Sequence, residues 1–325
     1  MTVKVSVIIP AYNAEKVISE AIGSILAQAG GYDLEILVAD DRSTDGTREV
    51  VARLAQRHPQ IVLLDNAGAK GPGGGRNTCL KRATGEYVAF LDADDVWLPD
   101  HLESGVSFLE RCRDFDIAFF NFDIVDYETK EVVGDWFSNR KAISRFRTEP
   151  VEDGFFQVMD DLYEALLGEC FIHVQSTILR KSSIGGLLFN EAYRWGEDLM
   201  FAIRLFRDYG LKCAFNGRKT VLYYRHQGSL TDYSAPHALS MVETQIRLYE
   251  ECRRYEKLTV KAAKTIDEKL LARHLLAAYY NRRQGRMRPA VRHVFRSCRY
   301  GLRTGQFLEL AKILIRTPGA LMAGD

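Results

Sequence analysis

The sequence predicts an α/β protein in which a mostly parallel, doubly wound, Rossmann-like sheet is flanked by helices and followed by a basic α-helical region. Two observations predict the sheet: short apolar runs alternate with segments of helical periodicity, and acidic residues recur where those runs end. A third predicts the helical region: residues 253–316 hold 17 Lys and Arg against 4 Asp and Glu. Since the whole chain has a net charge of only +1, the remainder is acidic.

Length and composition are those of an ordinary globular protein. The 325 residues have room for one large domain or two small ones, and 46% of them are apolar and 27% charged. The six cysteines are scattered without a CxxC pair, which argues against a zinc site or disulfide framework and favours a reducing compartment. No apolar run reaches 18 residues and no signal-peptide pattern is present, so a cytoplasmic protein is expected.

The first part of the chain alternates strand and helix patterns. Residues 4–10 form a near-continuous apolar run, as expected for a parallel strand covered on both faces. Further strands are predicted at 34–39, 61–64 and 87–91, and helices at 17–26, 47–54 and 76–83. Because the carboxyl ends of such strands face one crevice, Asp40 and Asp92 are expected to lie there together.

The second part is less regular. It predicts a helix from 99 to 112, a strand at 116–122, a hairpin and loop over 126–155, a helix at 158–167, strands at 170–179 and 220–225, and a helix that opens at residues 195–198. From Pro236 the chain is predicted to be helical almost to its end. We therefore expect a domain over 1–235, with halves 1–115 and 116–235, and a helical extension over 236–325.

Three carboxylates, Asp92, Asp94 and Asp95, follow the fourth strand directly. If the chain stays extended, Asp92 and Asp94 point the same way, and like charges held close repel unless a cation lies between them. Mg²⁺ or Mn²⁺, with a diphosphate completing the oxygen shell, is the usual solution. The alternative is an acidic turn that caps the next helix, and these residues alone do not decide between the two.

The glycine-rich segment 71–75 does not match the familiar phosphate-binding loops. Gly74 stands where a Walker motif requires lysine, and Arg76 stands where a dinucleotide fingerprint needs glycine. P-loop enzymes and Rossmann dehydrogenases are therefore disfavoured. Arg76, at a helix start, is a candidate contact for a phosphate or base, and the alternative is a surface arginine on a mobile loop.

Four segments, taken in order, resemble family 2 of the inverting glycosyltransferases, which have the GT-A fold. They are residues 7–13 (VIIPAYN), 38–47 (VADDRSTDGT), 75–77 (GRN) with 92–95 (DADD), and 195–198 (WGED). The resemblance implies an enzyme of polysaccharide or glycolipid synthesis. It would transfer a sugar from a nucleotide sugar, most simply a UDP-sugar, to a saccharide or lipid-linked saccharide, with Mn²⁺ or Mg²⁺ as cofactor.

The resemblance also implies which residues would bind the donor. Pro10 and Tyr12 would line the nucleotide pocket, with Tyr12 stacked on the base, and Asp40 would hydrogen-bond that base. Arg76 would face the base or the diphosphate. For Tyr12 the alternative is a core aromatic, and for Asp40 it is a turn cap.

For the metal, the resemblance makes Asp94 the direct ligand, with Asp92 near the ribose or the metal shell. Arg225 and His226, which end a predicted strand, are assigned to the diphosphate side, where the histidine of some related enzymes binds the metal. A lone exposed histidine often has neither role.

Proton transfer needs a base, because the acceptor hydroxyl must lose its proton as it attacks. An aspartate has an ordinary pKa of about 3.9 and is useful as a base when it is desolvated or lies near another carboxylate, a pairing that Glu197 and Asp198 supply. The resemblance assigns Asp198 as the base, and Glu197 and Trp195 to the acceptor. The alternative is that both acids merely stabilise a helix N-terminus.

The basic C-terminal helices allow three interpretations: a solvated face, a nucleic-acid site, or a surface that docks on an anionic membrane. No nucleic-acid module accompanies them, so no nucleic acid is expected. The apolar strip at 307–316 favours membrane docking at the cytoplasmic face. Two alternatives for the whole protein stay open: a transferase that uses a GDP- or dTDP-sugar, and a non-catalytic nucleotide-sugar-binding protein on the same fold.

Overall fold

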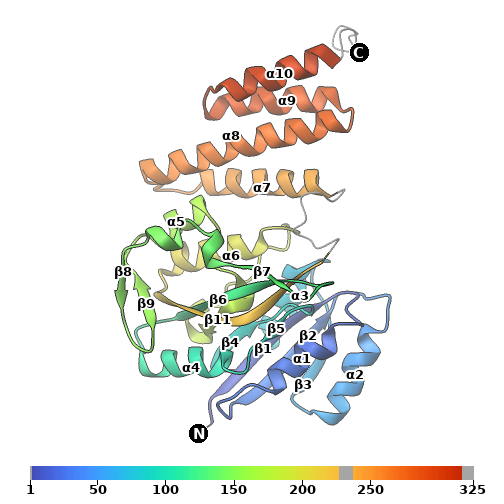
Figure 1. The fold of residues 1–325 in the computed structure, drawn as a ribbon, viewed down its shortest axis with the longest axis vertical. Helices are drawn as coiled ribbons and strands as arrows, with labels where there is room; N and C mark the ends of the chain where they lie inside the picture. Colours follow the sequence, from blue (N-terminus) through green and yellow to red (C-terminus); the bar gives the residue numbers. More distant parts are fainter. Residues whose placement is uncertain (1, 227–236, 317–325) are drawn as a thin grey trace. The chain divides into compact units, whose positions relative to one another are not determined.

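The computed structural model describes residues 2–226 and 237–316, with side chains up to residue 312 in the last helix. The chain divides into two compact units, residues 1–226 and 227–325 (Figure 1). The boundary predicted between residues 235 and 236 lies outside the described residues. In the part of the chain that the structure describes, no helix combines the length and apolar character needed to cross a membrane.

A mixed sheet forms the centre of the first unit, and in the described residues it has the strand order β3-β2-β1-β4-β10-β6-β11-β9-β8. β5 pairs with β11, and β7 pairs with β6. The strands are β1 Lys4–Ala11, β2 Asp33–Asp40, β3 Ile61–Asp65, β4 Tyr87–Phe90, β5 Val96–Trp97, β6 Ile117–Asp126, β7 Val132–Asp135, β8 Thr148–Pro150, β9 Phe155–Val158, β10 Thr177–Arg180 and β11 Cys213–Arg225.

Helices flank this sheet and make up the second unit (Figure 1). In the first unit they are α1 Ile18–Leu26, α2 Thr47–Arg57, α3 Pro72–Arg82, α4 His101–Arg111, α5 Leu162–Gly168 and α6 Glu197–Tyr209. In the second they are α7 Ala238–Arg253, α8 Val260–Arg283, α9 Met287–Ser297 and α10 Thr304–Arg316. The predicted fold class, an α/β sheet with flanking helices and then a helical C-terminal region, is confirmed.

Parallel pairing runs through the first half of the sheet and recurs between β6 and β11. β1 pairs in parallel with β2 and with β4, and β2 pairs in parallel with β3. In this register Ala11 is opposite Asp40, and Asp40 is opposite Asp65. The carboxyl ends of β1, β2 and β3 are therefore level, and β4, whose Phe90 is opposite Ile8, ends toward the same edge of the sheet.

Several element predictions differ from the structure at their boundaries: β11 begins at Cys213 and not at 220, and α3 begins at Pro72 and not at 76. The strand predicted over 170–179 forms only at Thr177–Arg180, because residues 174–176 make a 3-10 turn first. The helix predicted over 158–167 begins at Leu162, because Asp161 caps it by accepting the backbone N–H of Glu164 at 3.0 Å. Residues 155–158 instead form β9, which pairs with β11.

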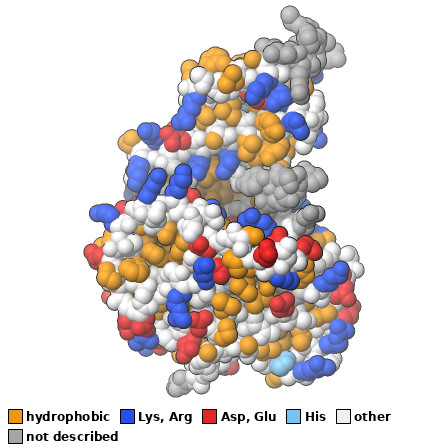
Figure 2. All heavy atoms as spheres, viewed as in Figure 1, with side chains coloured by type: hydrophobic (Ala, Val, Ile, Leu, Met, Phe, Trp, Pro, Cys, Tyr) orange, Lys and Arg blue, Asp and Glu red, His pale blue; other side chains and the backbone are white. Residues whose placement is uncertain are grey.

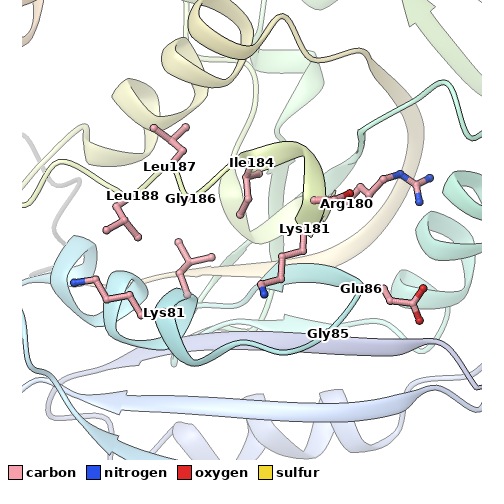
Figure 3. A pocket seen from close by; sticks show the side chains of 12 residues that line it. Lys81, Gly85, Glu86, Arg180, Lys181, Ile184, Gly186, Leu187 and Leu188 are labelled. Atoms are coloured by element: carbon pink, nitrogen blue, oxygen red, sulfur yellow. The ribbon is translucent and has the colours of Figure 1, made fainter.

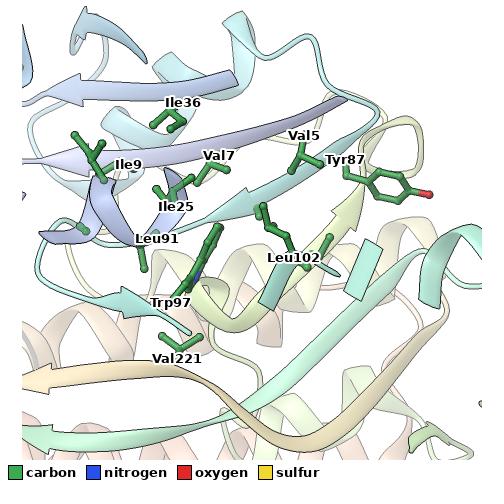
Figure 4. Packing of buried hydrophobic residues seen from close by; sticks show 14 of the residues in the cluster. Val5, Val7, Ile9, Ile25, Ile36, Tyr87, Leu91, Trp97, Leu102 and Val221 are labelled. Carbon is green, nitrogen blue, oxygen red and sulfur yellow. The ribbon is translucent and has the colours of Figure 1, made fainter. Parts of the chain in front are cut away.

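A large apolar cluster holds the first half of the sheet rigid (Figure 4). Val5, Val7 and Ile9 of β1 are fully buried in it, in the period-two pattern of a strand. Ile8, which points to the other face, is fully buried as well, so β1 is covered on both sides. Trp97 packs into the same cluster. Such packing fixes the ends of β1, β2 and β4, from which the candidate site is built.

Candidate functional site

Two acids and one arginine form a cluster at the carboxyl edge of the sheet, in which Arg76 and Glu197 are buried and Asp92 is partly buried. Arg76, in α3, is 3% exposed and donates from Nη2 to Asp92 Oδ1 at 2.7 Å. Its Nη1 donates to Glu197 Oε1 at 2.8 Å. The cluster joins the end of β4 to the first residue of α6. The structure thus brings three sequence-predicted residues, Arg76, Asp92 and Glu197, into direct contact.

Burial and charge act on this cluster in opposite senses. Burial lowers the pKa of Arg76, but the carboxylates of Asp92 and Glu197 outweigh it, so the net pKa is raised and the guanidinium stays charged. Burial, followed by repulsion from Asp198, raises the pKa of Glu197 to about 7, although Arg76 opposes the shift. Glu197 is therefore held close to its protonation point at neutral pH.

Glycines let α3 pack closely against the preceding loop and the end of β1, so that the Arg76 side chain faces the protein interior. A Cβ on Gly74 would lie 2.0 Å from the carbonyl oxygen of Ala69, which no side chain could tolerate. A Cβ on Gly75 would lie 3.1 Å from Pro10 Cβ at the end of β1. The glycine-rich segment is thus a packing device that seats α3 against β1, and Arg76 is not a surface residue.

Asp40 and Tyr12 lie on the β1–β2 side of the same edge. Asp40 is 2% exposed, and its Oδ2 accepts from the Ser43 N–H at 3.3 Å and from Arg48 Nη1 at 3.2 Å. Its Oδ1 is buried with no hydrogen-bond partner. Tyr12 is 48% exposed, and Lys70 Nζ lies 4.2 Å from the centre of its ring. Asp40 therefore keeps a buried, unpaired acceptor oxygen at a strand end opposite Ala11, the residue before the exposed Tyr12.

The acids that follow β4 have different environments. Asp94 Oδ2 lies 3.1 Å from His226 Nε2, at the end of β11, and both side chains are more than one-third exposed. Asp95 is fully buried, and its Oδ1 accepts the Tyr224 N–H at 2.9 Å. Burial, with repulsion from Asp94 and Asp92, raises the pKa of Asp95 well above its ordinary value. Asp95 therefore ties this turn to β11.

The remaining predicted residues are half-buried or exposed. Asp198 is half-buried, and its Oδ1 accepts the Leu199 N–H at 2.7 Å. Trp195 is also half-buried, with the Arg194 guanidinium 5.2 Å from its ring centre. Arg225 is exposed at the end of β11, next to His226. Pro10 is half-buried against Gly75.

Sequence reasoning missed three residues near the site. Arg48 of α2 bridges Asp40 and Asp65. Glu191 accepts from Asn77 Nδ2 at 2.8 Å and from the Ala69 N–H at 2.7 Å, so it holds the segment before α3. His173 packs among Trp136, Phe122 and Tyr223. A lone histidine between apolar residues 170–174 is a hint for His173, but nothing local marks Arg48 or Glu191.

The described residues hold no ready-made group of three or more His, Cys, Asp or Glu side chains that would bind a metal ion alone. A cavity of about 600 Å³ lies elsewhere, where Lys81 at the end of α3, Gly85 before β4 and Lys181 after β10 line it (Figure 3). This is the amino edge of β4, opposite the acids. We therefore place the candidate site by its chemistry and not by the size of a cavity.

A family model described as glycosyl transferase family 2 matches residues 6–161. The chain is 30% identical over 227 residues to an enzyme of Escherichia coli named UDP-Glc:alpha-D-GlcNAc-diphosphoundecaprenol beta-1,3-glucosyltransferase WfgD. The alignment covers 70% of this chain and 79% of that enzyme. It runs beyond the family-model match, which ends before α5 and α6.

Two solved structures have a similar fold at low sequence identity. TarS of S. aureus, in complex with UDP-GlcNAc, has a TM-score of 0.64 and 20% identity, over 90% of this chain and 80% of that one. The mannosyltransferase PcManGT of Pyrobaculum calidifontis, in complex with GDP-Man and Mn²⁺, has a TM-score of 0.57 and 18% identity, over 98% and 82%.

Proposed function

The chain belongs to glycosyl transferase family 2 and is a glycosyltransferase with the GT-A-type fold, and we propose that it transfers a sugar from a UDP-sugar to a hydroxyl group of a lipid-linked saccharide, with inversion. The similar E. coli enzyme is named for UDP-Glc and a diphosphoundecaprenol acceptor, which supports both parts of the proposal. An acceptor of this kind would bring the enzyme to the cytoplasmic face of a membrane.

The observation that carries the donor assignment is Asp40 Oδ1, which is buried without a partner. A buried polar atom left unpaired costs about 1–3 kcal/mol, so a ligand that donates to it gains that much. The N3–H of uracil is such a donor, and Tyr12 would stack on the same ring. Pro10 would line this pocket. Guanine and thymine also donate N–H groups, so a GDP- or dTDP-sugar is the alternative donor.

We propose Asp94 and Asp92 as the residues that hold Mn²⁺ or Mg²⁺. Their side chains are 38% and 26% exposed, and so can be reached by a ligand. Magnesium is commonly bound through one or two carboxylates plus substrate phosphates, so this pair fits without a complete protein cage. When bound, the ion would offset the negative charge that builds on the departing diphosphate. Arg225 and His226 are proposed for the diphosphate side.

We assign Asp198 as the base that takes the proton of the acceptor hydroxyl. The acceptor oxygen forms a bond to the anomeric carbon while the bond from that carbon to the diphosphate oxygen breaks, and its electron pair leaves with the diphosphate. Attack from the opposite face gives a β-linked product from an α-linked donor. Trp195 would provide an apolar platform for the acceptor sugar, and Glu197, held by Arg76, would orient it.

A donor screen tests the proposal. UDP-, GDP- and dTDP-sugars, each with Mn²⁺, are compared by the rise in melting temperature, since a ligand that binds the native state stabilises it. We expect the largest rise with a UDP-sugar, and metal-dependent release of UDP that Asp94→Ala abolishes. Asp114→Ala, which removes an exposed carboxylate between α4 and β6, is the matched control. Binding without any release of nucleotide would instead support a non-catalytic binding protein.

A further inference from the structure

Large apolar side chains are exposed on the last two helices and the turn between them. Phe295 of α9 is 62% exposed, and Leu302 in the turn is 72% exposed. Phe307 and Leu308 at the start of α10 are 65% and 59% exposed. Apolar surface of this kind is unfavourable in water and, where it gathers, marks a surface that meets a partner.

The core of the helical unit does not account for these side chains. α9 packs through the fully buried Ala290 and Val294 against Ala278 of α8, and Leu310 of α10 adds to that cluster. Phe295 directly follows Val294, so the helix turns it about 100° away from the packed seam. Leu310 of the predicted apolar strip points inward, and the side chains of residues 313–316 lie outside the described residues.

Exposed arginines surround Phe295. Arg292, Arg296 and Arg299 follow one another at spacings of four and three residues, which places them on one side of α9 and the turn after it, together with Phe295. Among the described residues no carboxylate pairs with any of these three arginines. In Figure 2 the helical unit carries blue and orange spheres with few red ones.

We propose that this surface docks on an anionic membrane. It consists of Arg292, Phe295, Arg296, Arg299 and Leu302, together with the exposed apolar side chains of α10. Arginines would meet the lipid phosphates while phenylalanine and leucine enter the boundary between head groups and acyl chains. The pairing of the two chemistries favours this partner, because a nucleic acid would not need the apolar side chains. The inference stands whichever nucleotide sugar is the donor.

The test is flotation of the full-length protein with vesicles of phosphatidylglycerol or of phosphatidylcholine. We expect binding to the anionic vesicles that weakens as salt is raised, because salt screens exposed charges. Each arginine near an anionic surface strengthens binding roughly fivefold, so Arg292→Gln, Arg296→Gln and Arg299→Gln together should weaken it on the order of 100-fold. Removing three exposed arginines of the first unit, with Arg53→Gln, Arg57→Gln and Arg82→Gln, is the matched control and should have little effect.

A second variant, Phe295→Ser with Phe307→Ser, tests the apolar contribution and should also weaken vesicle binding. If it binds vesicles as the wild type does, and a salt-sensitive gel shift with RNA is seen, the surface binds polyanions and the proposal is wrong. A dimer in light scattering that this variant abolishes would make a second copy the partner and would also overturn it. UDP release by these variants should remain at the wild-type rate, so loss of docking is distinguishable from failure of the proposed function.

Discussion

The two units of the chain use arginine in opposite ways. In the first, Arg76 is 3% exposed and divides its two terminal nitrogens between Asp92 and Glu197. In the second, Arg292 and Arg296 are exposed on α9, and no described carboxylate pairs with them. A buried cation must have its partners within the protein, whereas an exposed one is hydrated and can exchange water for an outside partner.

What decides how an arginine is paired is whether its side chain is buried or exposed, and not which unit it belongs to. The helical unit also contains a buried pair, in which Arg282 Nε donates to Glu309 Oε1 at 2.6 Å, with both side chains less than one-tenth exposed. Where an arginine of either unit is enclosed, the fold supplies its carboxylate. We infer that the enclosed arginines fix geometry, and that the exposed ones of α9 serve an interaction with another molecule.

The largest effect on activity is expected from Asp198→Asn, which tests whether Asp198 of the first unit is the base in sugar transfer. Loss of a general base should lower kcat by about 10²–10⁴-fold while the melting temperature stays near that of the wild type. Glu197→Gln is the matched comparison, because the amide that replaces the carboxylate keeps an oxygen that can accept the hydrogen bond from Arg76. If Glu197→Gln loses the activity and Asp198→Asn keeps it, the group with the pKa of about 7 is the base.

Arg76→Met sharpens the contrast between enclosed and exposed arginines. It would leave Glu197 buried and Asp92 partly buried without their cation, so the free energy of unfolding should fall by about 3–5 kcal/mol. Arg292→Gln should change it by less than about 0.5 kcal/mol, because that side chain is exposed. Urea denaturation measures both. Similar values for the two variants would remove the distinction between the units.

The sequence was sufficient for the parts of the site that depend on local pattern. Asp40 and Asp92 could be placed at one edge of the sheet because apolar runs mark where strands end, and the start of α6 could be placed from its helical periodicity. A helix that contains Arg76 was predicted from the segment after the glycines, but it begins at Pro72 and includes them, and the sequence left open whether the Arg76 side chain faces solvent or a ligand.

The parts of the site that the sequence did not predict depend on contacts between segments far apart in the chain. Arg76 meets Glu197 across 121 residues of chain, and Asp94 meets His226 across 132. Whether a side chain is enclosed follows from how helices pack on the sheet, and no local pattern encodes that. For the same reason the raised pKa of Glu197, which results from burial and from Asp198, could not be predicted from the motif alone.

The two units should also respond to pH in opposite directions. The pKa of Glu197 is about 7 in the folded chain and about 4.5 when unfolded, so its stabilising contribution is full below pH 4.5 and is lost as pH rises to 7. Burial, then His293, Arg296 and Arg299, lower the pKa of His274 to about 4 from 6.5, and Tyr300 stacks on its ring. The contribution of His274 is full above pH 6.5 and is lost as pH falls to 4.

Glu197 and His274 each contribute at most about 3 kcal/mol to the pH dependence of the free energy of unfolding. Urea denaturation between pH 4 and 8, for the wild type, Glu197→Gln and His274→Gln, separates them, because each variant removes one titrating group and keeps a hydrogen-bonding side chain. We expect Glu197→Gln to lessen the fall in the free energy of unfolding as pH rises to 7. We expect His274→Gln to lessen its fall as pH drops to 4. If both variants keep the wild-type profile, the titrating groups lie elsewhere.

The smallest effect, and the clearest separation of the two units, should come from their exposed aromatic residues. Tyr12 is 48% exposed beside Asp40, and Phe295 is 62% exposed among arginines. Tyr12→Ala should weaken UDP binding by about 1–3 kcal/mol, through lost base stacking, and leave vesicle binding unchanged. Phe295→Ser should do the reverse. Calorimetric titration of UDP and vesicle flotation, run on both variants, would show whether one exposed ring serves the nucleotide and the other the membrane. If both variants lose the same activity, the two surfaces act as one site, and the division of labour between the units does not hold.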